Sequence, residues 1–183
     1  MAALSRLTPA REATARVRMA VRTVRVRRFA AAFLDGLLAL TIALTPAAIA
    51  GATGGSGPVQ GRVFGVGLLV GTAYLLLRDA IPYAEWGARS LAKRWLGVRP
   101  YDIDGGEVDW KTSVRRNATV AAAFGIPAVT YVVGGHRGLP FGQTLLYVAV
   151  LLALVEGVLV IADREGARLG DRWAGTRVTE ARA

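Results

Sequence analysis

Long apolar stretches alternate with polar, basic segments along the chain. Within each stretch almost no polar residues recur at helical spacing, and each length is close to the ~20 residues that an α-helix needs to cross a bilayer. A soluble four-helix bundle would need a polar face on every helix, which Leu37–Leu44 and Leu145–Val155 do not offer. We therefore predict an all-α integral membrane protein with four transmembrane helices, at about residues 29–50, 63–81, 118–134 and 141–162.

The basic residues indicate how these spans are oriented. The chain of 183 residues has 23 Lys and Arg and a net charge of +10, with eight of these cations in residues 1–28, seven in 82–116 and five in 163–183. Only Arg62 and Arg137 fall in the two alternate loops. Because basic residues accumulate in cytoplasmic loops, both termini and the central loop are expected in the cytoplasm. Topology thus accounts for most of the charge, and no nucleic-acid partner is expected.

The segments divide into a basic N-terminal segment at 1–28, a four-helix domain at 29–178 and a C-terminal tail at 179–183. Residues 9–28 place valines and arginines on opposite helical faces, which suits binding to anionic lipid, although a disordered basic tail is equally compatible with the pattern. Residues 48–50 resemble a signal-peptide cleavage site, but the basic segment is too long and Asp35 interrupts the apolar region.

The central loop contains VRPYDIDGGEVDW, residues 98–110. Its Asp-Gly-Gly predicts a β-hairpin, with Pro100 confining the first strand to an edge. The acidic residues here lack the closing glutamate of a calcium loop, so a solvated turn is favoured. The chain has no cysteine, and His136 is its single histidine, so we expect no metal site and no cofactor.

Two basic boxes form an internal repeat. GARSLAKRWLGVR at 87–99 aligns with GARLGDRWAGTR at 166–177 across one gap, and each follows an even-numbered span. An Arg-Arg pair also opens each odd-numbered span, at 27–28 and 115–116. The pattern predicts two tandem helical hairpins about a pseudo-twofold axis along the membrane normal. We expect the boxes to dock on each other through Lys93 and Asp171, flanked by the tryptophans; the box residues singled out are Lys93, Arg94, Trp95, Asp171, Arg172 and Trp173.

Charged residues inside the spans are candidates for function because an unpaired charge in hydrocarbon is costly. Asp35 follows Arg28 by two helical turns, so both project from one face. In one interpretation Asp35 pairs with Arg28 or Arg78 and a neutral Glu156 helps to fix helix packing; in the other, the carboxylates share a cation or proton. The intramembrane cluster comprises Arg28, Asp35, Arg78, Asp79 and Glu156.

Three motifs resemble the RDD family of bacterial membrane proteins. Arg28-x-x-Ala31-x-x-x-Asp35 resembles its opening motif, SLAKRWLGVRPYDIDGG its cytoplasmic segment, and LGDRWAGTRV its C-terminal box, which would make Asp171 the second family aspartate. Ser90 and Ala92 stand where the family commonly has Thr and Gly. The resemblance implies a multi-pass protein of the bacterial inner membrane, for which transport, including sodium/proton exchange, or an accessory role in larger complexes has been proposed.

The residues do not suggest an enzyme, since no nucleophile–base pair or phosphate loop is present. The leading hypothesis is cation- or proton-coupled transport, which would need an oligomer because four short helices rarely enclose a path. The alternative is a non-catalytic accessory subunit that docks on an unrelated membrane protein. Glycines 65, 67 and 71 and alanines 121–123 provide small-residue faces that suit packing within the chain, a homo-oligomer or such a partner.

Overall fold

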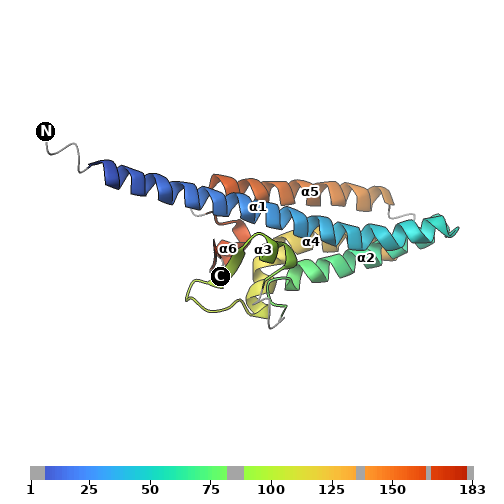
Figure 1. Ribbon diagram of the computed structural model, residues 1–183. Coiled ribbons are helices and arrows are strands. Elements are labelled where there is room, and N and C mark those ends of the chain that lie inside the picture. Colours follow the sequence, from blue (N-terminus) through green and yellow to red (C-terminus); the bar gives the residue numbers. More distant parts are fainter. Residues whose placement is uncertain (1–6, 82–88, 135–138, 164–165, 181–183) are drawn as a thin grey trace.

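The computed structural model describes residues 7–81, 89–134, 139–163 and 166–180, and the side chains from residue 23 onward, except that of Leu139. It consists of a bundle of long helices with a small module at one end (Figure 1). The long helices are α1 (Leu7–Ala52), α2 (Gly57–Leu77), α4 (Trp110–Gly134) and α5 (Leu139–Ala162). The module contains the short helices α3 (Leu91–Trp95) and α6 (Leu169–Ala174) and the strands β1 (Val98–Asp102) and β2 (Thr176–Glu180).

All four predicted spans are present as helices long and apolar enough to cross a membrane. They are Thr23–Ala52, Gly57–Leu77, Trp110–Gly134 and Pro140–Ala162, which confirms the fold class. The first span is continuous with the basic segment, whose backbone is helical from Leu7 onward. The second span ends earlier than expected, so Arg78 and Asp79 lie in the turn that follows α2.

Helix α2 packs between α1 and α4, and α5 packs mainly on α4. Close packing is possible because glycines of α2 face both neighbours. A Cβ atom at Gly67 or Gly71 would collide with the backbone of α1 at Ala43 or Ala39, and one at Gly65 would collide with α4. The glycine faces of α2 are therefore used within the chain. The apolar core lies at these contacts, where Phe64 and Tyr131 meet edge to face with ring centroids 5.0 Å apart.

The predicted hairpin within residues 98–110 is wrong, although its first strand exists. β1 pairs antiparallel with β2, from Val98 opposite Glu180 to Asp102 opposite Thr176. The Asp-Gly-Gly turn does form, with the Gly105 amide donating to the Asp102 carbonyl at 2.9 Å, but the chain then leads into α4. A second strand follows the second box, so two segments far apart in sequence pair. This strand also extends through residues 179 and 180, so the predicted tail of 179–183 begins within it.

The repeat of the two boxes is reproduced by the backbone. In each, a short helix is followed by a glycine with positive φ and then a strand: Gly97 (φ 64°) joins α3 to β1, and Gly175 (φ 65°) joins α6 to β2. Side chains rarely adopt this left-handed conformation, which explains a glycine at both positions. The boxes dock through the strands that follow them, at the end of the bundle where α2 and α5 end and α4 begins (Figure 1). We call this the charged end.

Candidate functional site

The charged end contains a buried cluster of ionisable side chains organised around three aspartates. The first, Asp35 on α1, is 1% exposed and accepts three hydrogen bonds. The donors are the Tyr74 hydroxyl at 2.8 Å, the Arg78 guanidinium at 3.1 Å and the Ser90 hydroxyl at 2.7 Å. The predicted pairing of Asp35 with Arg78 is confirmed. Because Ser90 is also the N-cap of α3, this carboxylate joins α1, α2 and the first box.

The second aspartate, Asp79, lies in the turn after α2 and is fully buried. It forms an ion pair with Lys93 of α3, lies 3.5 Å from the Arg116 guanidinium and accepts a hydrogen bond from the Asn117 amide at 3.2 Å. Burial alone would raise the pKa of Asp79, but Lys93, Arg116 and Arg78 outweigh it and hold the pKa well below its ordinary value. Burial lowers the pKa of Lys93, and Asp79 opposes that effect.

The third aspartate, Asp171 on α6, joins the second box to both odd-numbered spans. It pairs with Arg28 of α1 and accepts a hydrogen bond from Arg116 Nε of α4 at 2.8 Å. It also caps the N-terminus of its own helix, because its carboxylate accepts a hydrogen bond from the backbone amide of Arg168 at 3.0 Å. Arg28, the other candidate partner of Asp35, therefore binds Asp171 instead, and the predicted pair of Lys93 with Asp171 is wrong.

These corrections have one physical cause. Lys93 and Asp171 each bind the charged residues against which their own short helix packs in the folded protein. Lys93 thus lies against the end of α2 at Asp79, and Asp171 lies against the beginning of the first span and the beginning of α4. Spacing along the sequence places residues on helix faces but does not give the arrangement of neighbouring helices.

Sequence reasoning missed the residue that connects the three aspartates. The Asn117 side-chain oxygen accepts from Arg78 at 3.1 Å and from Arg168 at 2.6 Å, while its amide donates to Asp79. Asn117 is fully buried on α4, but in the sequence it directly follows Arg115 and Arg116, outside the predicted span, where a polar side chain is unremarkable. Its neighbour Arg116 could have been found, because it stands at the repeat position equivalent to Arg28.

The tryptophans expected to flank the docked boxes lie at the surface. Trp95 is 75% and Trp173 65% exposed. Arg94 is also exposed, and Arg172 pairs with Asp163 at the surface. Exposed aromatic rings at the end of a membrane bundle are typical of the boundary between lipid and water. Of the six box residues singled out in the sequence, Lys93 and Asp171 are the buried ones.

Glu156 of α5 stands apart from the three aspartates. It is 9% exposed, and one carboxylate oxygen accepts a hydrogen bond from Thr119 of α4 at 3.1 Å. Its other oxygen, Oε2, is buried and has no hydrogen-bond partner among the described residues. Among the described buried carboxylates, Glu156 is thus the one with a hydrogen-bond donor on only one of its two oxygens.

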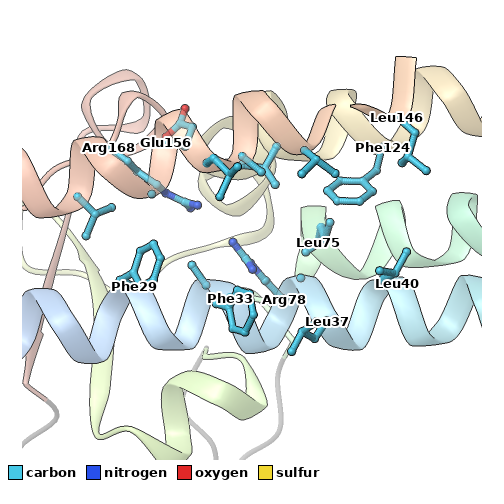
Figure 2. A pocket seen from close by; sticks show the side chains of 18 residues that line it. Phe29, Phe33, Leu37, Leu40, Leu75, Arg78, Phe124, Leu146, Glu156 and Arg168 are labelled. Atoms are coloured by element: carbon cyan, nitrogen blue, oxygen red, sulfur yellow. The ribbon is translucent and has the colours of Figure 1, made fainter. Parts of the chain in front are cut away.

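A pocket of about 280 Å³ opens between α1 and α5 beside Glu156 (Figure 2). Arg78 and Arg168 extend into the space between the two helices from opposite sides, and Phe29 and Phe33 of α1 line it. Burial, together with the like charges of Arg116 and Arg78, lowers the pKa of Arg168 to about 9, so this guanidinium still carries its charge at neutral pH. Farther from the charged end, leucines and Phe124 make the lining apolar.

The charged end has more buried cations than anions. The described buried residues include five cations, Arg28, Arg78, Lys93, Arg116 and Arg168, against four carboxylates, Asp35, Asp79, Glu156 and Asp171. Groups of three or more metal-ligating side chains are not found in the described part of the chain, and His136 lies outside it. Of the acidic loop residues, Glu107 pairs with Arg99 and Asp109 caps the first turn of α4 through the Thr112 amide at 2.7 Å.

No curated protein and no solved structure matches the chain. The model of the RDD family matches residues 23–175, which include all four spans, the three aspartates, the first box and all but the last two residues of the second box. With most of its length matched, and with Arg28, Asp35 and Asp171 buried at the charged end, this chain belongs to the RDD family of membrane proteins.

Proposed function

We propose that this protein mediates proton-coupled transport across the bacterial inner membrane, with Glu156 as the group that gains and loses the proton. The observation that carries the proposal is the incomplete bonding of Glu156. Its Oε2 atom is buried without a hydrogen-bond partner among the described residues, and Glu156 lines a pocket. A proton on Oε2 would remove the negative charge from a buried oxygen that no described donor stabilises.

Asp35 is a poorer candidate for the same role than the sequence suggested. Three donors, including the Arg78 guanidinium, already satisfy its carboxylate. Protonation would leave Arg78 without its buried anion, which is costly. Asp35 therefore serves as a structural anchor in this proposal.

A proton is favoured over a metal cation as the coupling ion. The cluster beside Glu156 already has an excess of buried cations, and Arg78 and Arg168 are the charged side chains that line the same pocket. Another cation would be repelled there, whereas a proton can bind to the carboxylate itself. The role is not enzymatic, and an oligomer would complete the transport path.

Proton flux into proteoliposomes that contain an internal pH dye tests the proposal. Glu156→Gln preserves shape and the bond to Thr119 but cannot ionise, so flux should fall by at least about tenfold, within the range of proton-transfer effects. Glu107→Gln is the matched control, because that carboxylate is exposed outside the spans. A folded Glu156→Gln protein with wild-type flux would eliminate the proposal.

A second candidate, an accessory subunit, is supported by the surface of α5. This helix leaves a broad apolar face uncovered, including Tyr147, Leu151 and Val158. Lipid or a partner protein can cover such a face. Copurification from mild detergent distinguishes the candidates: a homo-oligomer favours the transporter, whereas a stoichiometric unrelated protein, released by replacing Leu151 with Asn, favours the subunit.

The proposed orientation places the charged end in the cytoplasm, as the distribution of basic residues suggests. The chain has no native cysteine, so single cysteines at Gly55, Gly106 and the C-terminus report on topology directly. A membrane-impermeant maleimide should label only Gly55→Cys in intact cells. External labelling of Gly106→Cys would show that the protein has the opposite orientation in the membrane.

A further inference from the structure

The pocket between α1 and α5 has the chemical character of a site for an amphiphile. Its walls are almost wholly apolar, with Leu37, Leu40 and Phe124 among the lining residues, while Arg78 and Arg168 lie at one end. Its volume of about 280 Å³ is close to the lower end of the ~300–1,000 Å³ typical of ligand sites. A hydrocarbon chain suits these walls and an anion suits the charged end.

The two arginines that line the pocket have unused hydrogen-bonding capacity. Both are more than nine-tenths buried, and the Nε atoms of both lack hydrogen-bond partners among the described residues. Their other nitrogens bind Asp35 and Asn117, and Arg168 Nε lies 3.6 Å from an Asp171 oxygen. Because buried cations outnumber carboxylates in the cluster, an added anion would bring the charges closer to balance.

The pocket is open toward the bilayer. Phe33 and Leu37 on the α1 side and Val150 and Leu154 on the α5 side line it, and all four side chains are substantially exposed within membrane-spanning segments. Lipid is therefore in contact with the opening, and the charged end lies where the spans leave the hydrocarbon, at the depth of lipid headgroups.

We propose that this pocket binds one anionic phospholipid, with an acyl chain along the groove between α1 and α5 and the phosphate directed toward Arg78 and Arg168. This site is distinct from the basic N-terminal segment, which attracts anionic lipid only by surface charge. It goes beyond the proposed transport role, because it does not require that Glu156 exchange protons. An ionised Glu156 lies near the phosphate end and would weaken binding.

Native mass spectrometry of the full-length protein in detergent, titrated with phosphatidylglycerol or with phosphatidylcholine of the same acyl chains, tests the proposal. The key variant is Gly36→Leu: Gly36 lines the pocket, and a Cβ there meets no atom within 4 Å, so the larger side chain starts in open space and takes up pocket volume. Ala48→Leu is the matched control, because it adds a similar side chain to an exposed position of α1 outside the pocket.

The wild-type protein and Ala48→Leu should retain one phosphatidylglycerol in preference to phosphatidylcholine. Gly36→Leu should lower the affinity for phosphatidylglycerol by about tenfold or more, and inorganic phosphate should not compete. Glu156→Gln should raise that affinity. Equal retention of the two lipids, unchanged binding in Gly36→Leu, or displacement by inorganic phosphate alone would each overturn the proposal.

The same variants separate this proposal from the transport proposal. Glu156→Gln should lose flux yet bind phosphatidylglycerol more tightly, whereas Gly36→Leu should lose lipid preference. If Glu156→Gln keeps wild-type flux while Gly36→Leu loses the lipid, transport fails and the lipid site stands. The reverse pattern removes only the lipid site.

Discussion

Arg28 and Asp171 form a buried ion pair that joins the beginning of the first span to the last short helix. Both side chains are almost completely withdrawn from solvent, and Arg116 contacts the same carboxylate from α4. The pair thus connects α1, α4 and α6 at a single point. Asp35 is the other motif aspartate and lies on α1, and it contacts Arg78 instead.

Removal of the Asp171 charge is expected to destabilise the protein strongly. Asp171→Asn leaves Arg28 and Arg116 buried without this anion, and breaking a buried pair costs about 3–5 kcal/mol. Glu180→Gln, which breaks the exposed pair with Arg27, is the control and should cost about 0–1 kcal/mol. Thermal unfolding in detergent measures both, and equal melting temperatures would contradict the burial argument.

Asp35 and Arg78 should behave as an energetically coupled pair. Asp35→Asn leaves a buried guanidinium without its carboxylate, and Arg78→Gln leaves the carboxylate without its guanidinium. The double variant removes both charges, so the two losses should not add, and the coupling should be about 0.5–3 kcal/mol. A thermodynamic cycle of denaturant unfolding provides the value. Strict additivity would show that the pair contributes nothing beyond its separate members.

Acid should destabilise the protein partly through Asp79. Its pKa in the folded state lies well below the ordinary value, so the unfolded chain binds the proton first as pH falls. This contribution is complete above about pH 4 and is lost progressively as pH falls toward the folded-state pKa. Melting temperature measured from neutral pH to pH 3 should fall less steeply in Asp79→Asn, which starts from lower stability. Parallel curves would exclude Asp79 as a source.

At alkaline pH, Lys93 contributes to the dependence of folding stability on pH. Its pKa in the folded state is lowered by burial, so between that pKa and the ordinary value of about 10.4 the unfolded chain binds more protons. Stability linked to Lys93 therefore rises with pH within this window. Lys93→Met should remove the rise, whereas Lys111→Met should leave it unchanged.

Gly170 should tolerate no side chain. It begins α6 against α4, and a Cβ there would collide with the backbone carbonyl of Arg116, which cannot shift without disturbing the ion pairs of Asp171. Gly170→Ala should lower stability by about 1–3 kcal/mol, as overpacking does. Gly36→Ala is the control, because the added methyl group enters open space, and it should be neutral or stabilising by about 0.5–1 kcal/mol. Similar melting temperatures for the two would show that α6 can move away from α4.

The sequence alone determined the spans, the repeat and the family. Apolar runs near twenty residues long specify membrane helices through composition and length, which need no knowledge of neighbours. The two boxes were recognisable because equal backbone conformations require equal residues, above all Gly97 and Gly175 at positive φ. The sequence also showed that the charges lie near one end of the spans, because the distance of a residue from the end of a helix follows from counting residues.

Only the tertiary structure decided which charges meet. Asp35 had two candidate cations and the structure selects Arg78; Lys93 and Asp171, opposite in charge and equivalent in the repeat, bind other partners. β1 pairs with β2, which follows two further spans in the sequence, rather than with a local strand. The bridging role of Asn117 was likewise invisible in the sequence. These pairings depend on the separation and tilt of helices distant in sequence, and the side-chain periodicity of one segment does not contain that information.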